Sequence, residues 1–281
     1  MAARIHAHRV VIAAGVLMLV ATAAIAQYST DLEALNGSPA GVILTGQDGW
    51  TLPAASVDWK VYTYAGNTLS LPQNLTGGAH FAGGTSQGGT NYARAEHSLS
   101  VGAIPQWQAS YDFAATFLGT PPATQNLGSF SINPVVPQDY IHLATWVDIN
   151  APTSFNFYYL AYDAAGVQFA QPGQIPGPAW SNLSLNHWYR AWEVFDFSIN
   201  QIIEVGIRDL TTGSQVVVIP VGWYLEGGTG GSTAPSTAFR FFAGGAAGNT
   251  FAFDNLVIEP RGPTAVEPST WGRIKSTYRL D

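Results

Sequence analysis

Short runs of β-branched and aromatic residues follow one another along most of this chain, and turn-forming residues separate them. Nine such runs lie at 57–64, 107–118, 140–149, 154–163, 187–198, 201–210, 214–225, 237–245 and 249–260. Runs of this composition are typical of β-strands. Their abundance predicts an all-β protein whose body contains no helix of ten residues.

Two turn sequences indicate that neighbouring strands run antiparallel. DAAG at 163–166 and DLTTG at 209–213 each end on a glycine, which adopts positive φ without strain, and each lies between two strand-like runs. Strands without alternating helices predict two antiparallel sheets packed as a β-sandwich of the jelly-roll type. Two glycine-rich stretches, at 77–89 and 227–231, are expected to be long loops.

The first 26 residues differ from the rest of the chain. Arg4 and Arg9 precede an uncharged apolar run at 10–21, and Ala-Ile-Ala at 24–26 offers the small residues that signal peptidase recognises. The apolar run is shorter than the 18 or so residues that a spanning helix needs. We therefore expect a helical secretory signal at 1–26 and no membrane span after its removal. The protein would then be secreted or held at the cell surface.

The last 21 residues also form a separate segment, at 261–281, after a sandwich domain at 27–260. A proline-rich linker leads to WGRIKSTYRL, which as a short helix would place Trp271, Ile274 and Tyr278 on one face. Ten residues are marginal as a free helix in water. We expect this tail to order against a sorting or attachment partner, with a disordered end as the alternative.

Charge and cysteine content exclude several classes of protein. The body at 27–260 carries 16 acidic residues and five basic ones, Lys60, Arg94, Arg190, Arg208 and Arg240. Nucleic-acid binding needs clustered lysine and arginine and is therefore not expected. The chain has no cysteine, so an exported domain must be stabilised by its core or by a metal, which fits a bacterial secreted protein. It also lacks the HExxH motif of zinc peptidases.

Three stretches together resemble a known family. TDLEALNGSPAGVILTGQDGW at 30–50, NHWYRAWEVFDFS followed by DLTTG, and FAFDNLVIEP at 251–260 are similar to the first, middle and closing strands of secreted concanavalin A-like and carbohydrate-binding-module jelly rolls. The resemblance spans 27–260 and implies glycan binding on the concave sheet.

The same resemblance implies one structural Ca²⁺ ion where the first and last strands meet. By position its ligands would be Glu33 and Asp254, with Asp31 nearby, and such oxygen ligands suit Ca²⁺. Leu32 stands where the family motif prefers phenylalanine. In the alternative interpretation these acids only cap strand ends.

The stretch WYRAWEVFDFS, at 188–198, contains Glu193 and Asp196 among aromatic residues. Side chains alternate between the two faces of a strand, so residues three apart point to opposite sides and these two acids are not expected to act as a glycosidase pair. The acidic signature of sandwich-fold glucanases is also absent. The same alternation places Trp188, Arg190 and Trp192 on one face, where they are candidates for a sugar-stacking surface. The alternative is that these rings belong to the core.

These observations favour an exported, non-catalytic sandwich that binds glycans or another cell-surface or matrix component. Two alternatives stay open. A structural matrix protein would self-associate, and a divergent glycoside hydrolase would bring two acids together in a cleft.

Overall fold

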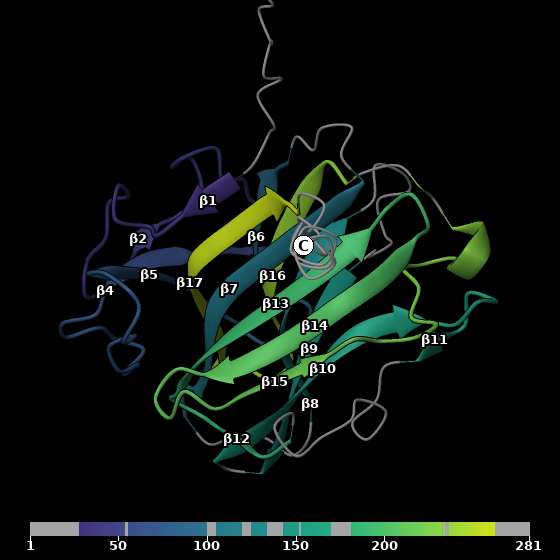
Figure 1. Ribbon diagram of the computed structural model, residues 1–281. Coiled ribbons are helices and arrows are strands. Elements are labelled where there is room, and N and C mark those ends of the chain that lie inside the picture. Colours follow the sequence, from purple (N-terminus) through teal and green to yellow (C-terminus); the bar gives the residue numbers. More distant parts are fainter. Residues whose placement is uncertain are drawn as a thin grey trace, which may run out of the picture.

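Two β-sheets packed face to face form the structure, a computed structural model (Figure 1). It describes residues 28–53, 56–99, 105–119, 125–133, 143–151, 153–169, 181–231, 233 and 236–261. The predicted all-β antiparallel sandwich is thereby confirmed. The helices expected in the segments 1–26 and 261–281 lie outside these ranges. Arg261 is the one residue of the tail that the structure describes.

The first sheet has nine strands in the order β15-β14-β13-β7-β17-β5-β4-β2, and β1 also pairs with β17. All of these pairs are antiparallel. The strands are β1 (Tyr28–Thr30), β2 (Val42–Ile43), β4 (Lys60–Thr63), β5 (His80–Thr85), β7 (Gln106–Phe117), β13 (Trp188–Asp196), β14 (Gln201–Asp209), β15 (Gln215–Val218) and β17 (Asn249–Pro260).

The second sheet has eight strands in the order β11-β10-β9-β8-β16-β6-β3, and β12 also pairs with β10. Only the short pair of β3 with β6 is parallel among its named strands. The strands are β3 (Val57–Asp58), β6 (Ala93–Ser98), β8 (Gln125–Asn133), β9 (Leu143–Ala151), β10 (Ser154–Tyr162), β11 (Gln168–Phe169), β12 (Leu183–Ser184) and β16 (Ala238–Ala243). A 3-10 turn, η2 (Gly228–Gly230), precedes β16.

Aromatic rings fill the space between the sheets. Phe253 of β17 stacks on Phe241 of β16, with ring centroids 3.9 Å apart and planes at 7°. Trp50 and Trp59 lie against Phe253 at 5.5 and 5.7 Å, and both are buried. Because large rings meet from both sheets, their burial is the main apolar contribution that holds the sandwich together.

The two hairpin turns expected from the sequence are confirmed. At 163–166, the Gly166 amide donates to the Asp163 carbonyl and Gly166 has φ +81°. At 209–213, the Gly213 amide donates to the Asp209 carbonyl and Gly213 has φ +74°. Both glycines adopt the left-handed backbone that these turns require.

The glycine-rich stretch at 77–89 is expected to be a loop, and this prediction is wrong for its central residues. Residues His80–Thr85 form β5, which pairs with both β4 and β17. Glycine is used here for close packing: a Cβ on Gly83 would lie 2.7 Å from Leu69, and one on Gly84 would lie 2.3 Å from Nε1 of Trp59. Small residues in this strand therefore make room for large neighbours on both faces.

Within the described ranges, the structure contains no helix with the length and hydropathy to cross a membrane.

Gly84→Ala should destabilise the fold by about 1–3 kcal/mol, because a methyl group would overlap the buried indole of Trp59. Urea denaturation followed by tryptophan fluorescence measures the change. Gly230→Ala is the matched control, since nothing lies within 4 Å of its Cβ position. Equal stability of the two variants would contradict the tight packing inferred at β5.

Candidate functional site

Strand β13 places alternate side chains on opposite faces of the nine-stranded sheet, as the sequence predicts. Tyr189, Ala191 and Phe195 belong to the main core, whereas Trp188 belongs to a smaller apolar cluster outside it. The pairing of β13 with β7 is regular from Trp188 to Asp196, and the register shift between Val194 and Phe195 in the pairing with β14 places its extra residue in β14.

The carboxyl groups of Glu193 and Asp196 therefore do not meet. Glu193 is fully buried, and neither of its oxygens has a hydrogen-bond partner among the described residues. Asp196 lies at the end of the strand, where Oδ2 accepts a hydrogen bond from Gln106 and Oδ1 accepts one from the Ser198 amide. Burial raises the pKa of Glu193 well above its ordinary value, which favours the neutral acid.

Trp188 is covered by the segment that connects β4 to β5. Its side chain is 3% exposed, and its Nε1 donates a hydrogen bond of 2.8 Å to the carbonyl of Pro72. Edge contacts with Tyr64 and Phe81 complete its surroundings. Of the three residues proposed for a sugar-stacking surface, the structure leaves Arg190 and Trp192 partly exposed and encloses Trp188.

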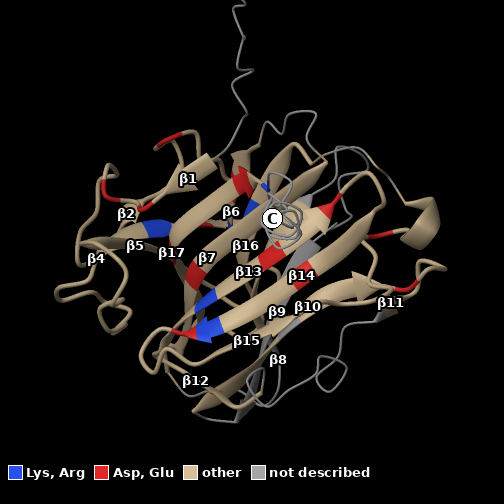
Figure 2. Ribbon diagram, viewed as in Figure 1, with Lys and Arg blue, Asp and Glu red and all other residues tan. Residues whose placement is uncertain are grey.

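A line of polar residues crosses five adjacent strands on the outer face of the nine-stranded sheet. Gln215, Arg208, Arg190, Asp112 and Asp254 are successive cross-strand neighbours on β15, β14, β13, β7 and β17. We call this line the charged row. It runs from two arginines to two aspartates, and the basic positions on β13 and β14 adjoin in Figure 2.

Asp112 is the most heavily hydrogen-bonded residue of the charged row. It is fully buried, and Arg190 binds it with Nε to Oδ1 at 2.6 Å and Nη2 to Oδ2 at 3.0 Å. Side chains of Asn74, Thr76 and Asn255 also donate to Oδ2, at 2.9, 2.6 and 2.8 Å. The hydrogen bond to Asp112 raises the pKa of Arg190, and the two-point contact fixes the direction of its guanidinium group.

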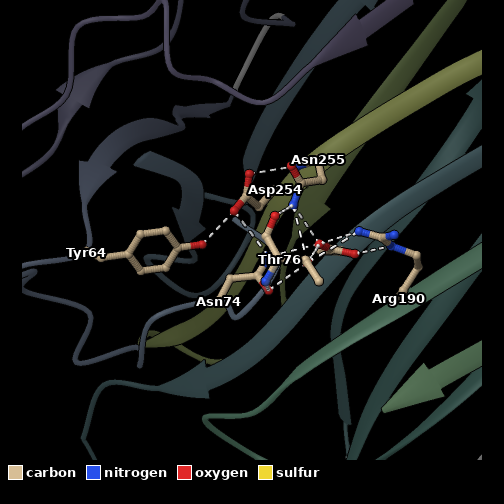
Figure 3. A network of polar contacts seen from close by, with 7 residues as sticks. Tyr64, Asn74, Thr76, Arg190, Asp254 and Asn255 are labelled. Atoms are coloured by element: carbon tan, nitrogen blue, oxygen red, sulfur yellow. Dashed lines mark hydrogen bonds and ion pairs between the residues drawn. The ribbon is translucent and has the colours of Figure 1, made fainter. Parts of the chain in front are cut away.

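Asp254 forms the second half of the same network, which Figure 3 shows from close by. Its Oδ2 accepts hydrogen bonds from the Tyr64 hydroxyl at 2.7 Å and from Asn74 at 3.2 Å, and its Oδ1 accepts the Asn255 amide at 2.7 Å. Burial raises the pKa of Asp254 to about 6, and burial together with the nearby Asp254 raises the pKa of Tyr64.

Asp112 and Asp254 are two carboxyl groups brought together by a register that the sequence does not reveal. Glycosidases use two nearby carboxyl groups whose different environments give them different pKa values. Here, however, both side chains are fully buried, and Asn74 donates to both of them. Their Oδ2 atoms accept hydrogen bonds from Tyr64, Asn74 and Thr76 of the β4–β5 connection. The pair therefore acts as a junction that fastens this connection to the sheet and orients Arg190.

A second line, next to the charged row, consists of small uncharged residues and one large ring. Val217, Gly206, Trp192, Ser110 and Val257 are cross-strand neighbours on the same five strands. We call it the aromatic row. The Trp192 indole lies over Gly206, where an added Cβ would be 1.9 Å from its Cζ2. Trp192 is half-buried, and its cross-strand neighbours Gly206 and Ser110 are small.

Polar contacts hold the Trp192 ring in this position. Its Nε1 donates a hydrogen bond of 3.0 Å to Glu204 Oε1, and Arg261 binds the other carboxyl oxygen of Glu204 at 3.0 Å. The aromatic row thus offers an oriented ring beside an oriented guanidinium group.

The three residues proposed to bind calcium accept hydrogen bonds from different donors. Glu33 Oε1 accepts the amides of Ala79 and His80 at 2.7 and 2.9 Å, and Asp31 Oδ1 accepts the amide of Glu33 at 3.1 Å. Asp254 belongs to the network above. The described part of the chain holds no cluster of three or more His, Cys, Asp or Glu side chains suited to a metal. Calcium binding stays a prediction.

Comparisons with known proteins find distant structural similarities. No family model and no curated protein matches it. A carbohydrate esterase, vb_24B_21 of the Shiga toxin-encoding bacteriophage phi24B, aligns at 12% identity over 73% of this chain and 90% of its own, with a TM-score of 0.43. The CBM2 module of an evolved Dit from Lactobacillus casei BL23 phage J-1 aligns at 13% identity over 84% of this chain and 96% of its own, also with a TM-score of 0.43. Basic winged bean lectin aligns at 9% identity over 83% of this chain and 96% of its own, with a TM-score of 0.41. Likenesses this distant carry no information on ligand or activity.

Glu193→Met should stabilise the protein increasingly as pH rises. Unfolding lets Glu193 ionise near its ordinary pKa of about 4.3, whereas the folded state keeps it protonated to a much higher pH. Between these two values the folded state holds the extra proton, so the free energy of unfolding falls with rising pH by about 1.4 kcal/mol per pH unit.

Urea denaturation of the wild type and of Glu193→Met from pH 5 to 8 measures this difference. The gap between the two should widen toward pH 8. Glu259→Met, at an exposed position of β17, is the control and should follow the wild type. Parallel curves for the wild type and Glu193→Met would show that Glu193 is not a neutral buried acid.

Proposed function

We infer that the protein is an exported glycan-binding β-sandwich, and that a sugar ring stacks on Trp192 with Arg190 bonding its hydroxyl groups. The observation that carries this proposal is the partly exposed Trp192 ring, which lies over Gly206 on the same sheet face as Arg190. Export rests on the signal-like sequence at 1–26.

The chemistry of the two rows suits a carbohydrate. An indole face covers the apolar face of a pyranose, and small neighbours such as Gly206 and Ser110 leave room for the rest of the ring. Arg190 is 36% exposed, and its Nη1 group makes no hydrogen bond to a described residue. Because Asp112 holds the opposite side of the guanidinium group, Nη1 is free to donate to a ligand without reorganisation.

A second candidate function is self-association as a structural surface protein. β15 is at the edge of the sheet and, among the described residues, pairs only with β14. Val217, Ile219 and Val221 along and beyond it are exposed by 44, 66 and 93%. Unpaired edge strands with apolar side chains favour pairing between molecules. Sedimentation equilibrium tests this function: oligomers that Val217→Lys converts to monomers would support it.

Trp192→Ala should abolish most glycan binding, because stacked aromatic rings carry a large share of the affinity at such sites. Affinity electrophoresis through gels containing soluble polysaccharides measures retardation. Trp192→Phe should retain part of it. Tyr92→Ala is the matched control, an aromatic residue that packs against Phe242 of β16 on the other sheet. Retardation that survives Trp192→Ala but is lost in Tyr92→Ala would move the site to that sheet.

A further inference from the structure

Two arginines oppose each other beside the Trp192 ring. Arg190 and Arg208 are a cross-strand pair on β13 and β14. Like charges in this position are destabilising, since the Cβ atoms of such pairs are about 4.5–5.5 Å apart. The sandwich at 27–260 has only five basic residues against 16 acids, yet two of the five adjoin here.

The two arginines differ in how their charge is balanced. Arg190 is compensated by the buried carboxyl of Asp112. Arg208 is exposed and makes no ion pair with any described residue, and its Nη2 lies 3.8 Å from the Cβ position of Gly213 in the turn after β14. The uncompensated positive charge of this surface therefore belongs to Arg208, on a long side chain that is free to turn toward a ligand.

The spacing matches a single sugar residue. Two residues along a strand correspond to about 6.8 Å, which separates the charged row from the aromatic row. A pyranose stacked on Trp192 would carry its exocyclic group to the level of Arg190 and Arg208. There, the free Nη1 of Arg190 and the guanidinium of Arg208 would face that group from two sides.

We propose that this surface selects anionic glycans, with the carboxylate or sulfate group of a sugar held between Arg190 and Arg208 while its ring stacks on Trp192. The proposal rests on the glycan-binding function and names the class of ligand. Guanidinium groups bind such oxyanions through paired, charge-assisted hydrogen bonds, which a neutral hydroxymethyl group at the same place does not form.

The test compares polymers of different charge on the same protein. Affinity electrophoresis is run with polygalacturonate, dextran sulfate and neutral laminarin, at low and at moderate salt. The wild type should be retarded by one or both anionic polymers more strongly than by laminarin, and polygalacturonate against dextran sulfate identifies carboxylate or sulfate as the group.

Arg208→Gln should weaken binding to the anionic polymer by about tenfold and leave any laminarin binding unchanged. Arg94→Gln is the matched control: it removes the same charge from β6 of the other sheet, where Arg94 lies over the rings of Tyr92 and Phe242. Thermal denaturation confirms that both variants are folded.

The outcomes separate the two proposals. Equal losses in Arg208→Gln and Arg94→Gln would reduce the effect to net charge and overturn the anionic site. Binding to laminarin alone, abolished by Trp192→Ala, would also overturn it while glycan binding stands. Failure of the wild type to bind any of a broad set of glycans would overturn both.

Discussion

The antiparallel pairing of β7 with β17 is the constraint on which both the core and the candidate site depend. Each strand has twelve residues, and the ladder joins Asn249 with Phe117 at one end and Pro260 with Trp107 at the other. On the inner face this pairing aligns the rings that meet the second sheet. On the outer face it sets Asp112 directly opposite Asp254. A shift of one residue in register would exchange these faces, so aromatic burial also fixes the position of the carboxyl pair.

Two buried carboxyl groups side by side are unfavourable unless donors surround them. The chain meets this requirement with residues distant in sequence: Tyr64, Asn74 and Thr76 from the β4–β5 connection, and Arg190 from β13. A bulge in β17 after Asp254 adds Asn255, whose φ of 47° turns its side chain toward Asp112. These hydrogen bonds hold the β4–β5 connection over Trp188. They also fix the direction of the Arg190 guanidinium group, which is partly exposed.

The sequence predicts the fold class well because strand composition, turn glycines and alternation are local properties. Alternation along β13 also separates Glu193 from Trp192 correctly. The sequence does not reveal contacts between residues that are far apart in the chain. Asp112 lies in an ordinary strand-like run, and nothing near it marks its neighbours on β13 and β17. The burial of Trp188 depends on Pro72, more than a hundred residues earlier. β5 was missed because its glycines match large side chains of other strands, a relation visible only in three dimensions.

Contacts between distant segments also explain why one tryptophan of β13 is buried and the other is partly exposed. Both Trp188 and Trp192 point to the outer face, but the β4–β5 connection reaches only the first. Over Trp192 the neighbouring strands contribute Gly206 and Ser110, which are too small to cover an indole. The ring is then retained by one hydrogen bond to Glu204 and by contact with the backbone of β14. Trp192 is therefore partly exposed beside an arginine whose direction Asp112 fixes, and the proposed glycan site rests on this arrangement.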